Sequence, residues 1–119
     1  MELKTRFYLV DGEGRKFMGI GVLWLLEKTD ELGSLRKAAK DMTISYTKAY
    51  NMVKRLEEAI GREVLDRHKG GSSRDGASLT PFGLRLVRLY RTFQEEARER
   101  VEEPYRRFLE ELEKNTEEN

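Results

Sequence analysis

A group of polar and basic residues in the segment after Ser45 has the types and the spacing to bind a DNA duplex. The group comprises Thr47, Lys48, Asn51, Lys54 and Arg55, with Tyr46 and Tyr50 at its flanks. Four apolar residues recur at helical spacing on the other side of the same segment: Ala49, Val53, Leu56 and Ile60. A helix here would bury the apolar side and expose the polar group. A solvated helix face without a ligand is the alternative interpretation.

Each of these side chains suits a particular contact in the major groove of DNA. An asparagine bonds adenine, a lysine bonds guanine, and a threonine methyl group or an aromatic ring packs on the methyl group of thymine. We therefore expect base contacts from Asn51, Lys48 and Thr47, or from one of the tyrosines in place of Thr47. Lys54 and Arg55 come later in the helix, so we expect them to meet phosphates.

Two serines position this helix and the one before it. Ser34 is a good N-cap for a predicted helix over 35–42, and Ser45 is a good N-cap for the helix over 46–60. Two capped helices with a joint of three residues between them predict a helix-turn-helix. The free amides at a helix N-terminus also bind phosphate, so both serines are candidate DNA contacts. Capping alone is the alternative role for Ser34.

A basic, glycine-rich loop follows the second of these helices. The pattern predicts strands over 64–67 and 77–79 that pair as a β-hairpin with the loop at its tip. Its candidate DNA contacts are Arg67, Lys69, Ser72, Ser73 and Arg74. Positive charge on such a tip can follow a phosphate backbone or enter the minor groove, although an ordinary surface loop has the same composition. His68 has only Asp66 as a partner at ligand spacing, so we expect no metal or catalytic site.

The first thirty residues supply the rest of the predicted core. Alternation over 3–10 predicts a strand, the sequence of residues 11–14 predicts a tight turn, and 16–18 can return as a short partner strand. Apolar residues cover nearly all sides of 20–30, so we expect this segment to be a buried central helix.

The last predicted helix, which Thr80 caps and Pro81 starts, is amphipathic for about thirty residues. Its distal apolar stripe comprises Phe93, Ala97, Val101, Tyr105, Phe108 and Leu112. One small domain cannot cover this stripe, so we expect a second copy of the chain to cover it in a homodimer. Pro104 should kink this helix or divide it in two. The alternative to a dimer is that the helix folds back at Pro104 onto its own domain. We expect a winged helix domain over 1–93, a dimerisation helix over 94–114 and a frayed tail over 115–119.

The charge distribution favours a polyanionic partner, and the composition disfavours an enzyme. Residues 34–91 hold 13 Lys and Arg against 6 Asp and Glu, a net charge of +7, whereas residues 94–119 hold 5 against 10, a net charge of −5. A basic body with an acidic tail is typical of a chain that binds nucleic acid with one part. With no cysteine and one histidine, we expect no enzyme activity, no cofactor and no metal. The absence of a long apolar run and of a secretory signal predicts a cytoplasmic protein without a membrane partner.

Several spaced motifs of the chain occur in the order of a known prokaryotic family. They are GSLRKAAK at 33–40, ISYTKAY at 44–50, Leu56-Glu57, Gly61, Leu65, Arg67, Gly70-Gly71 and LTPFG at 79–83. Together they resemble the N-terminal DNA-binding domain of the ModE family of molybdate-responsive regulators, and more loosely the LysR-type helix-turn-helix. The resemblance implies DNA binding and dimerisation. ModE regulators also carry C-terminal oxyanion-binding domains to which nothing in this sequence corresponds, so we expect no oxyanion ligand.

These observations predict a mainly α fold with small β elements: a winged helix-turn-helix with an N-terminal β-hairpin and a long C-terminal dimerisation helix. The expected function is sequence-specific regulation of transcription by a homodimer that binds double-stranded DNA, with a palindromic operator as the expected site. The alternative is a winged helix module that binds another protein and no DNA. Such a module has no need for the positive charge of residues 34–91.

Overall fold

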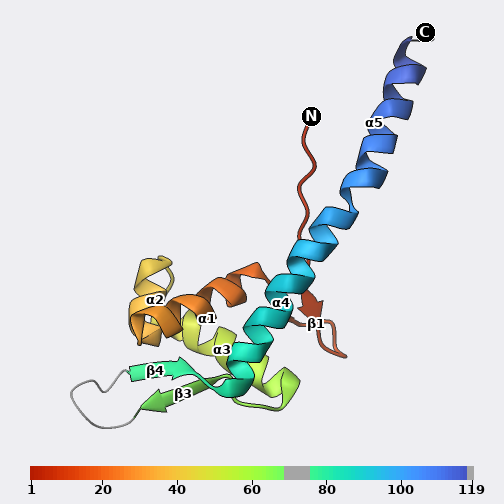
Figure 1. Ribbon diagram of the computed structural model, residues 1–119. Coiled ribbons are helices and arrows are strands. Elements are labelled where there is room, and N and C mark those ends of the chain that lie inside the picture. Colours follow the sequence, from red (N-terminus) through yellow and green to blue (C-terminus); the bar gives the residue numbers. More distant parts are fainter. Residues whose placement is uncertain (69–75, 118–119) are drawn as a thin grey trace.

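The computed structural model describes residues 1–68 and 76–117, and it confirms the predicted winged helix architecture (Figure 1). The elements are β1 (Leu9–Val10), β2 (Lys16–Met18), α1 (Ile20–Leu32), α2 (Leu35–Asp41), α3 (Tyr46–Ile60), β3 (Leu65–His68), β4 (Gly76–Leu79), α4 (Pro81–Arg100) and α5 (Glu102–Glu117). Helices α1, α2 and α3 pack together beside two separate two-stranded sheets. Helix α4 leaves this body and α5 continues outward, so the molecule measures 71 × 29 × 23 Å.

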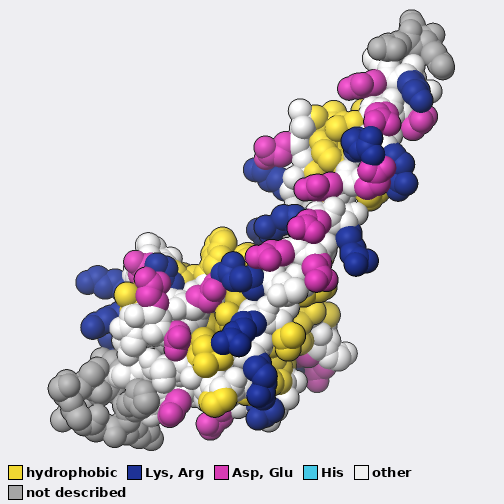
Figure 2. All heavy atoms as spheres, in the orientation of Figure 1, with side chains coloured by type: hydrophobic (Ala, Val, Ile, Leu, Met, Phe, Trp, Pro, Cys, Tyr) yellow, Lys and Arg dark blue, Asp and Glu magenta, His cyan; other side chains and the backbone are white. Residues whose placement is uncertain are grey.

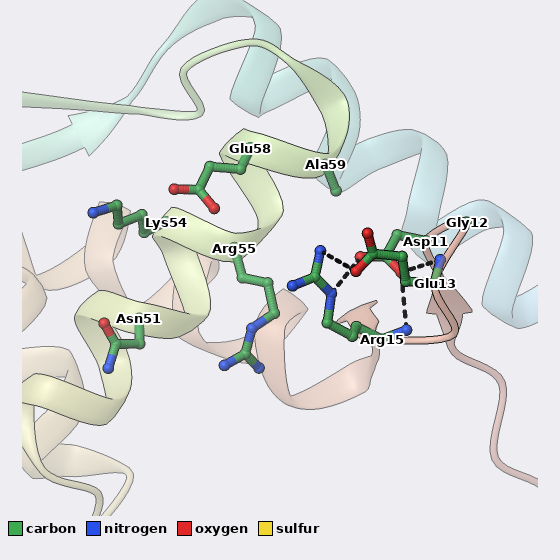
Figure 3. A pocket seen from close by; sticks show the side chains of 9 residues that line it. All are labelled: Asp11, Gly12, Glu13, Arg15, Asn51, Lys54, Arg55, Glu58 and Ala59. Atoms are coloured by element: carbon green, nitrogen blue, oxygen red, sulfur yellow. Dashed lines mark hydrogen bonds and ion pairs between the residues drawn. The ribbon is translucent and has the colours of Figure 1, made fainter.

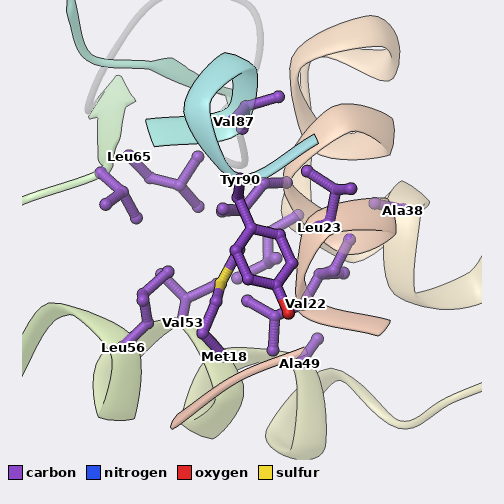
Figure 4. Close-up of a cluster of buried hydrophobic side chains, with 14 of the residues drawn as sticks. Met18, Val22, Leu23, Ala38, Ala49, Val53, Leu56, Leu65, Val87 and Tyr90 are labelled. Atoms are coloured by element: carbon purple, nitrogen blue, oxygen red, sulfur yellow. The ribbon is translucent and has the colours of Figure 1, made fainter. Parts of the chain in front are cut away.

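The core lies between α1 and the elements that pack around it (Figure 4). Its largest fully buried side chains come from β2, α1, α3 and the segment before β3: Met18, Leu23, Leu25, Leu26, Val53, Leu56 and Val64. Helix α1 is central, as predicted, but it is not buried on all sides. Trp24 is largely exposed, and Glu27 on a neighbouring face pairs with Arg91 of α4 at 2.5 Å. Trp24 lies on a part of α1 that its neighbours leave uncovered, whereas Glu27 lies on the side that faces α4.

The helix-turn-helix forms where the serines and the apolar pattern predict it. The Ser34 hydroxyl accepts a hydrogen bond from the Lys37 amide at 3.1 Å, and the Ser45 hydroxyl accepts one from the Lys48 amide at 3.0 Å. Both contacts are N-caps of the kind expected from the sequence. Ala38 and Ala39 are fully buried on α2, which packs against both α1 and α3.

The turn between the two helices closes as a Schellman motif. The Ile44 amide donates to the Ala39 carbonyl at 3.0 Å, and the Thr43 amide donates to the Lys40 carbonyl at 3.1 Å. Thr43 has a φ of 58°, in the left-handed region where glycine is the usual residue. The sequence has a β-branched residue here, so the turn carries local backbone strain.

The second hairpin, formed by β3 and β4 and called the wing below, is anchored to the helices by carboxylates. Strands β3 and β4 are antiparallel, with Leu65 opposite Leu79. The Glu57 carboxylate of α3 accepts a hydrogen bond from the Val64 amide at 2.8 Å, and Asp30 of α1 accepts one from the Leu79 amide at 2.9 Å. The hairpin therefore has a fixed base next to the C-terminal part of α3. Its predicted tip residues Lys69, Ser72, Ser73 and Arg74 lie outside the described residues.

The predicted N-terminal strand over 3–10 is too long. Only Leu9 and Val10 pair with β2, because β2 has three residues and offers no partner farther back. The preceding residues run along α4 instead (Figure 1). The hydroxyl of Tyr90 and the side-chain amide of Gln94 both donate to the Phe7 carbonyl at 3.1 Å. The rings of Phe7 and Phe93 meet edge to face, with their centroids 6.3 Å apart.

The last predicted helix is divided at Val101. Proline at 104 has no amide hydrogen for the Arg100 carbonyl, and its ring crowds that carbonyl. Helix α4 accordingly ends at Arg100, and α5 begins at Glu102. Helix α5 points away from the body rather than folding back onto it, and it extends to Glu117 (Figure 1).

Candidate nucleic-acid interface

The polar face of α3 is exposed, as its apolar pattern predicts. Ala49, Val53 and Leu56 are fully buried. The exposed side chains are Thr47, Lys48, Asn51, Lys54 and Arg55, the set that sequence analysis selected. Within the described residues, none of the three cations among them forms an ion pair. They are therefore available to an external anion.

The N-terminal hairpin borders this face, which sequence analysis did not foresee. A polar hollow of about 620 Å³, open to solvent, lies between the turn of this hairpin and the exposed face of α3 (Figure 3). The hollow is lined by Asp11, Gly12, Glu13 and Arg15 from the turn and by Asn51, Lys54, Arg55, Glu58 and Ala59 from α3. The hairpin turn lies beside α3 because β2 contacts α3, and no sequence pattern within either segment predicts this contact.

The charges of the hairpin turn are satisfied within the turn itself. The Asp11 carboxylate accepts hydrogen bonds from the amides of Glu13 and Arg15, both at 2.9 Å, and from the Arg15 guanidinium at 3.1 Å. The Arg15 amide is the main cause that lowers the pKa of the Asp11 carboxyl below its usual value. Arg15 also pairs with Glu13 at 3.1 Å. The unpaired cations of the hollow are consequently those of α3.

Tyr46 and Tyr50 are half-buried and pack against the core. The guanidinium of Arg36 lies over the ring of Tyr46 at 4.2 Å, and that of Arg67 lies over the ring of Tyr50 at 4.7 Å. The sequence pattern predicted Arg67 as a DNA contact but gave no such prediction for Arg36. The only signal for Arg36 was that it is a basic residue near the start of the first helix of the motif.

The two capping serines differ in exposure. Ser45 is exposed at the N-terminus of α3, where its neighbours include the candidate DNA contacts. Ser34 is 3% exposed. It also bridges to Gly76 of β4, and the Gly33 carbonyl beside it accepts from the Ala77 amide at 2.9 Å. The Ser34 hydroxyl therefore serves as a cap, which favours the capping role, and a DNA contact from Ser34 remains a prediction.

The apolar stripe of the last two helices is partly covered by the chain itself. Leu3 and Thr5 of the N-terminal segment line a hollow with Val101 and Tyr105. Phe93, Phe108 and Leu112 remain exposed, and Phe108 is 57% exposed. Leu89, which the predicted stripe omits, is 69% exposed on α4. Figure 2 shows hydrophobic side chains over the body beside α4 and again on α5, with charged side chains around them.

Two kinds of feature are absent from the described residues. No group of three or more histidine or acidic side chains could hold a metal ion there. None of the helices in that part of the chain is both long enough and apolar enough to cross a membrane.

Comparison with protein families gives a match over the helix-turn-helix and the wing. The model of the family described as "Bacterial regulatory helix-turn-helix protein, lysR family" matches residues 22–84, more than half of the chain.

Curated relatives of the chain include ModE regulators. The transcriptional regulator ModE of Haemophilus influenzae is 33% identical over 66 residues, which cover 56% of this chain and 26% of that protein. The DNA-binding transcriptional dual regulator ModE of Escherichia coli K12 is 36% identical over 58 residues, which cover 49% of this chain and 22% of that protein. The chain thus spans about a quarter of the length of these relatives.

Similar solved structures include DNA complexes. The CbnR_DBD-DNA complex has a TM-score of 0.57 at 25% identity, with 71% of this chain and 91% of that chain covered. The BenM_DBD/benA site 1 DNA complex has a TM-score of 0.55 at 24% identity, with 75% and 94% covered, and it supports the fold alone.

Proposed function

Since this chain belongs to the lysR family of bacterial regulatory helix-turn-helix proteins, we propose that it is a sequence-specific DNA-binding regulator of transcription. The observation that carries the proposal is the exposed face of α3, whose cations have no ion-pair partner in the described residues. This face lies between a hairpin with satisfied charges and the base of the wing. Regulation takes place on chromosomal DNA, so the proposal also places the protein in the bacterial cytoplasm.

In this proposal α3 enters the major groove and reads bases with its N-terminal part. Asn51 bonds an adenine, Lys48 bonds a guanine, and Thr47 packs on a thymine methyl group. Lys54 and Arg55 lie farther along the helix and bind phosphates. The exposed N-terminus of α3 at Ser45 supports a further phosphate contact.

The wing supplies contacts outside the major groove. Arg67 is exposed on β3, next to α3. The tip residues complete this set: Lys69, Ser72, Ser73 and Arg74. The net charge of +7 over residues 34–91 supports a polyanionic partner for the whole surface.

A homodimer is the proposed active form. An isolated helix of the length of α5 is only marginally stable in water, and this one has few contacts with the body. Its exposed Phe108 and Leu112 continue the apolar stripe of Phe93, Ala97, Val101 and Tyr105. Two copies that cover each other's stripes would present two α3 helices about 34 Å apart, which suits a palindromic operator.

Fluorescence anisotropy with labelled duplexes tests this function. Duplexes are first selected from random DNA by the protein, and affinity is then measured across a salt series for a selected and a scrambled duplex. With about 6 to 10 phosphate contacts, affinity should fall by roughly three orders of magnitude or more between 50 and 200 mM salt. A flat salt response, or equal affinity for both duplexes, would falsify the regulator proposal and favour a protein-binding module.

A further inference from the structure

Four side chains from three elements form a continuous row along one flank of α3. The Cζ atom of Arg36, from α2, lies 4.2 Å from the ring centroid of Tyr46. The rings of Tyr46 and Tyr50 are 6.3 Å apart, and Arg67 of β3 lies 4.7 Å from the centroid of Tyr50. We call these four residues the stacked row. Tyr50 and Arg67 also line one hollow with other residues of α3 and β3, so this end of the row lies on the side of α3 that faces the β3–β4 hairpin.

The tyrosines and the arginines of the stacked row have different surroundings. Tyr46 and Tyr50 are half-buried and pack against the core, so their rings are held in place. Arg36 and Arg67 are exposed. The guanidinium carbons lie 4.2 and 4.7 Å from the centres of rings that are themselves held in place, and these cation–π contacts restrain both arginine side chains. The row therefore restrains two arginine side chains that would otherwise rotate freely.

We infer that the stacked row holds Arg36 and Arg67 in place as phosphate contacts, and that Tyr46 and Tyr50 are positioning residues rather than readers of bases. The inference rests on the proposed function and adds Arg36 to the proposed DNA-binding residues. In helix-turn-helix proteins the helix before the reading helix crosses the DNA backbone, which is where α2 presents Arg36. A preorganised arginine loses less freedom when it binds phosphate than a mobile one does.

A double-mutant cycle separates this role from base reading by the tyrosine. Arg36→Ala, Tyr46→Leu and the double variant are compared by anisotropy on a duplex selected by the wild-type chain and on a scrambled duplex. Arg36→Ala should weaken binding to both by about tenfold and lower the salt slope by about 0.9, as loss of one phosphate contact does. Tyr46→Leu should weaken both by about threefold. It should have almost no effect when Arg36 is already alanine, because it acts through that arginine.

Two controls make the result specific. Tyr46→Phe keeps the ring and should keep wild-type affinity and sequence preference, even if Tyr46→Leu lowers stability. Arg62→Ala removes one positive charge from a similar stack, in which Arg62 lies 4.3 Å from the ring of Phe82 at the other end of α3. This control should change affinity and salt slope much less than Arg36→Ala does.

The possible results distinguish the roles of Arg36 and Tyr46 from the proposed DNA-binding function. Additive effects in the cycle, or a change of preferred sequence in Tyr46→Leu or Tyr46→Phe, would overturn the positioning role and leave the DNA-binding function standing. An Arg36→Ala variant that behaves like Arg62→Ala would overturn the phosphate contact. A wild-type chain that binds no duplex would remove the proposed function and this inference together.

Discussion

The α-carbon of Gly83, in the first turn of α4, packs directly against the backbone carbonyl of Val64, which precedes β3. A Cβ atom at position 83 would overlap that carbonyl oxygen and press on a Leu79 side-chain carbon at 3.2 Å. The same carbonyl accepts a hydrogen bond from the Thr80 amide at 3.0 Å, and the Thr80 hydroxyl caps the Gly83 amide at 2.9 Å. This contact joins the start of the outward-pointing helix to the base of the wing.

Gly83→Ala should therefore destabilise the protein, by roughly 1–3 kcal/mol, because the backbone at Val64 must shift to admit the methyl group. Urea unfolding followed by circular dichroism measures the change. Gly21→Ala is the matched control, since no atom lies within 4 Å of a Cβ there. It should stabilise α1 by about 0.5–1 kcal/mol. Equal stabilities for the two variants would contradict the close contact at Gly83.

Thr43→Gly should stabilise the protein by about 1 kcal/mol. A side chain in the left-handed region costs roughly 1–2 kcal/mol, and glycine removes this cost at the price of some unfolded-state entropy. Thr43→Ala keeps a Cβ atom and should gain much less. Thermal and urea unfolding of both variants test the prediction, and a glycine variant no more stable than the alanine variant would show that the turn is unstrained.

Phe108→Glu combined with Leu112→Glu should abolish dimer formation at micromolar concentrations. Each exposed apolar side chain buried at the interface contributes about 1.5–3 kcal/mol per subunit, so association should weaken by several orders of magnitude. Sedimentation equilibrium gives the oligomeric state, and circular dichroism shows whether the body stays folded.

A second double variant provides the matched control for the dimer interface. Thr92→Glu with Lys114→Gln also changes the net charge by −2 at exposed helical positions, by adding one negative charge and removing one positive charge, but neither residue belongs to the apolar stripe. This variant should remain dimeric. If the stripe variant also remains dimeric, the interface lies elsewhere, for instance at exposed Leu89.

Asn51→Ala and Lys54→Ala should impair DNA binding in different ways. Loss of a base contact changes which sequence is preferred, so Asn51→Ala should relax specificity at one base pair by about 1–3 kcal/mol. Loss of a phosphate contact weakens all duplexes alike, so Lys54→Ala should leave the preference intact and reduce the salt slope by about 0.9. Repeating the selection from random DNA with each variant is decisive. Uniform weakening by both would show that α3 does not read bases through Asn51.

The stability of the N-terminal turn should depend on pH through the Asp11 carboxyl. Its folded-state pKa is lowered chiefly by the Arg15 amide, so its stabilising contribution is complete above the ordinary aspartate pKa. The contribution is lost as the pH falls through the lowered folded-state value. Carboxyl NMR titration should therefore give Asp11 a midpoint below the usual value. Arg15→Ala removes the guanidinium but retains the backbone amide donor, so it should raise that midpoint only part of the way to the ordinary aspartate value. An ordinary midpoint in the wild type would contradict the hydrogen bonds of the turn.

The sequence by itself determined the features that depend on local periodicity and capping. Helix α3 begins after Ser45 and ends before Gly61, as predicted, because a hydroxyl cap and a left-handed glycine each act on the adjacent helix end. The exposed face of α3 follows from the positions of Ala49, Val53 and Leu56, since a helix that buries one side must expose the other. Pro104 likewise predicts a kink or a division of the last helix, because its effect reaches only one turn back.

Only the tertiary structure decided which distant segments meet. Alternation over residues 3–10 is equally compatible with a long strand, and it was the shortness of β2 and the bonds from Tyr90 and Gln94 to Phe7 that placed this segment on α4. Arg36 comes over Tyr46 because α2 crosses α3, and Ser34 is buried because the wing returns beside it. Such contacts join residues that share no local pattern, so the packing of the whole chain sets them.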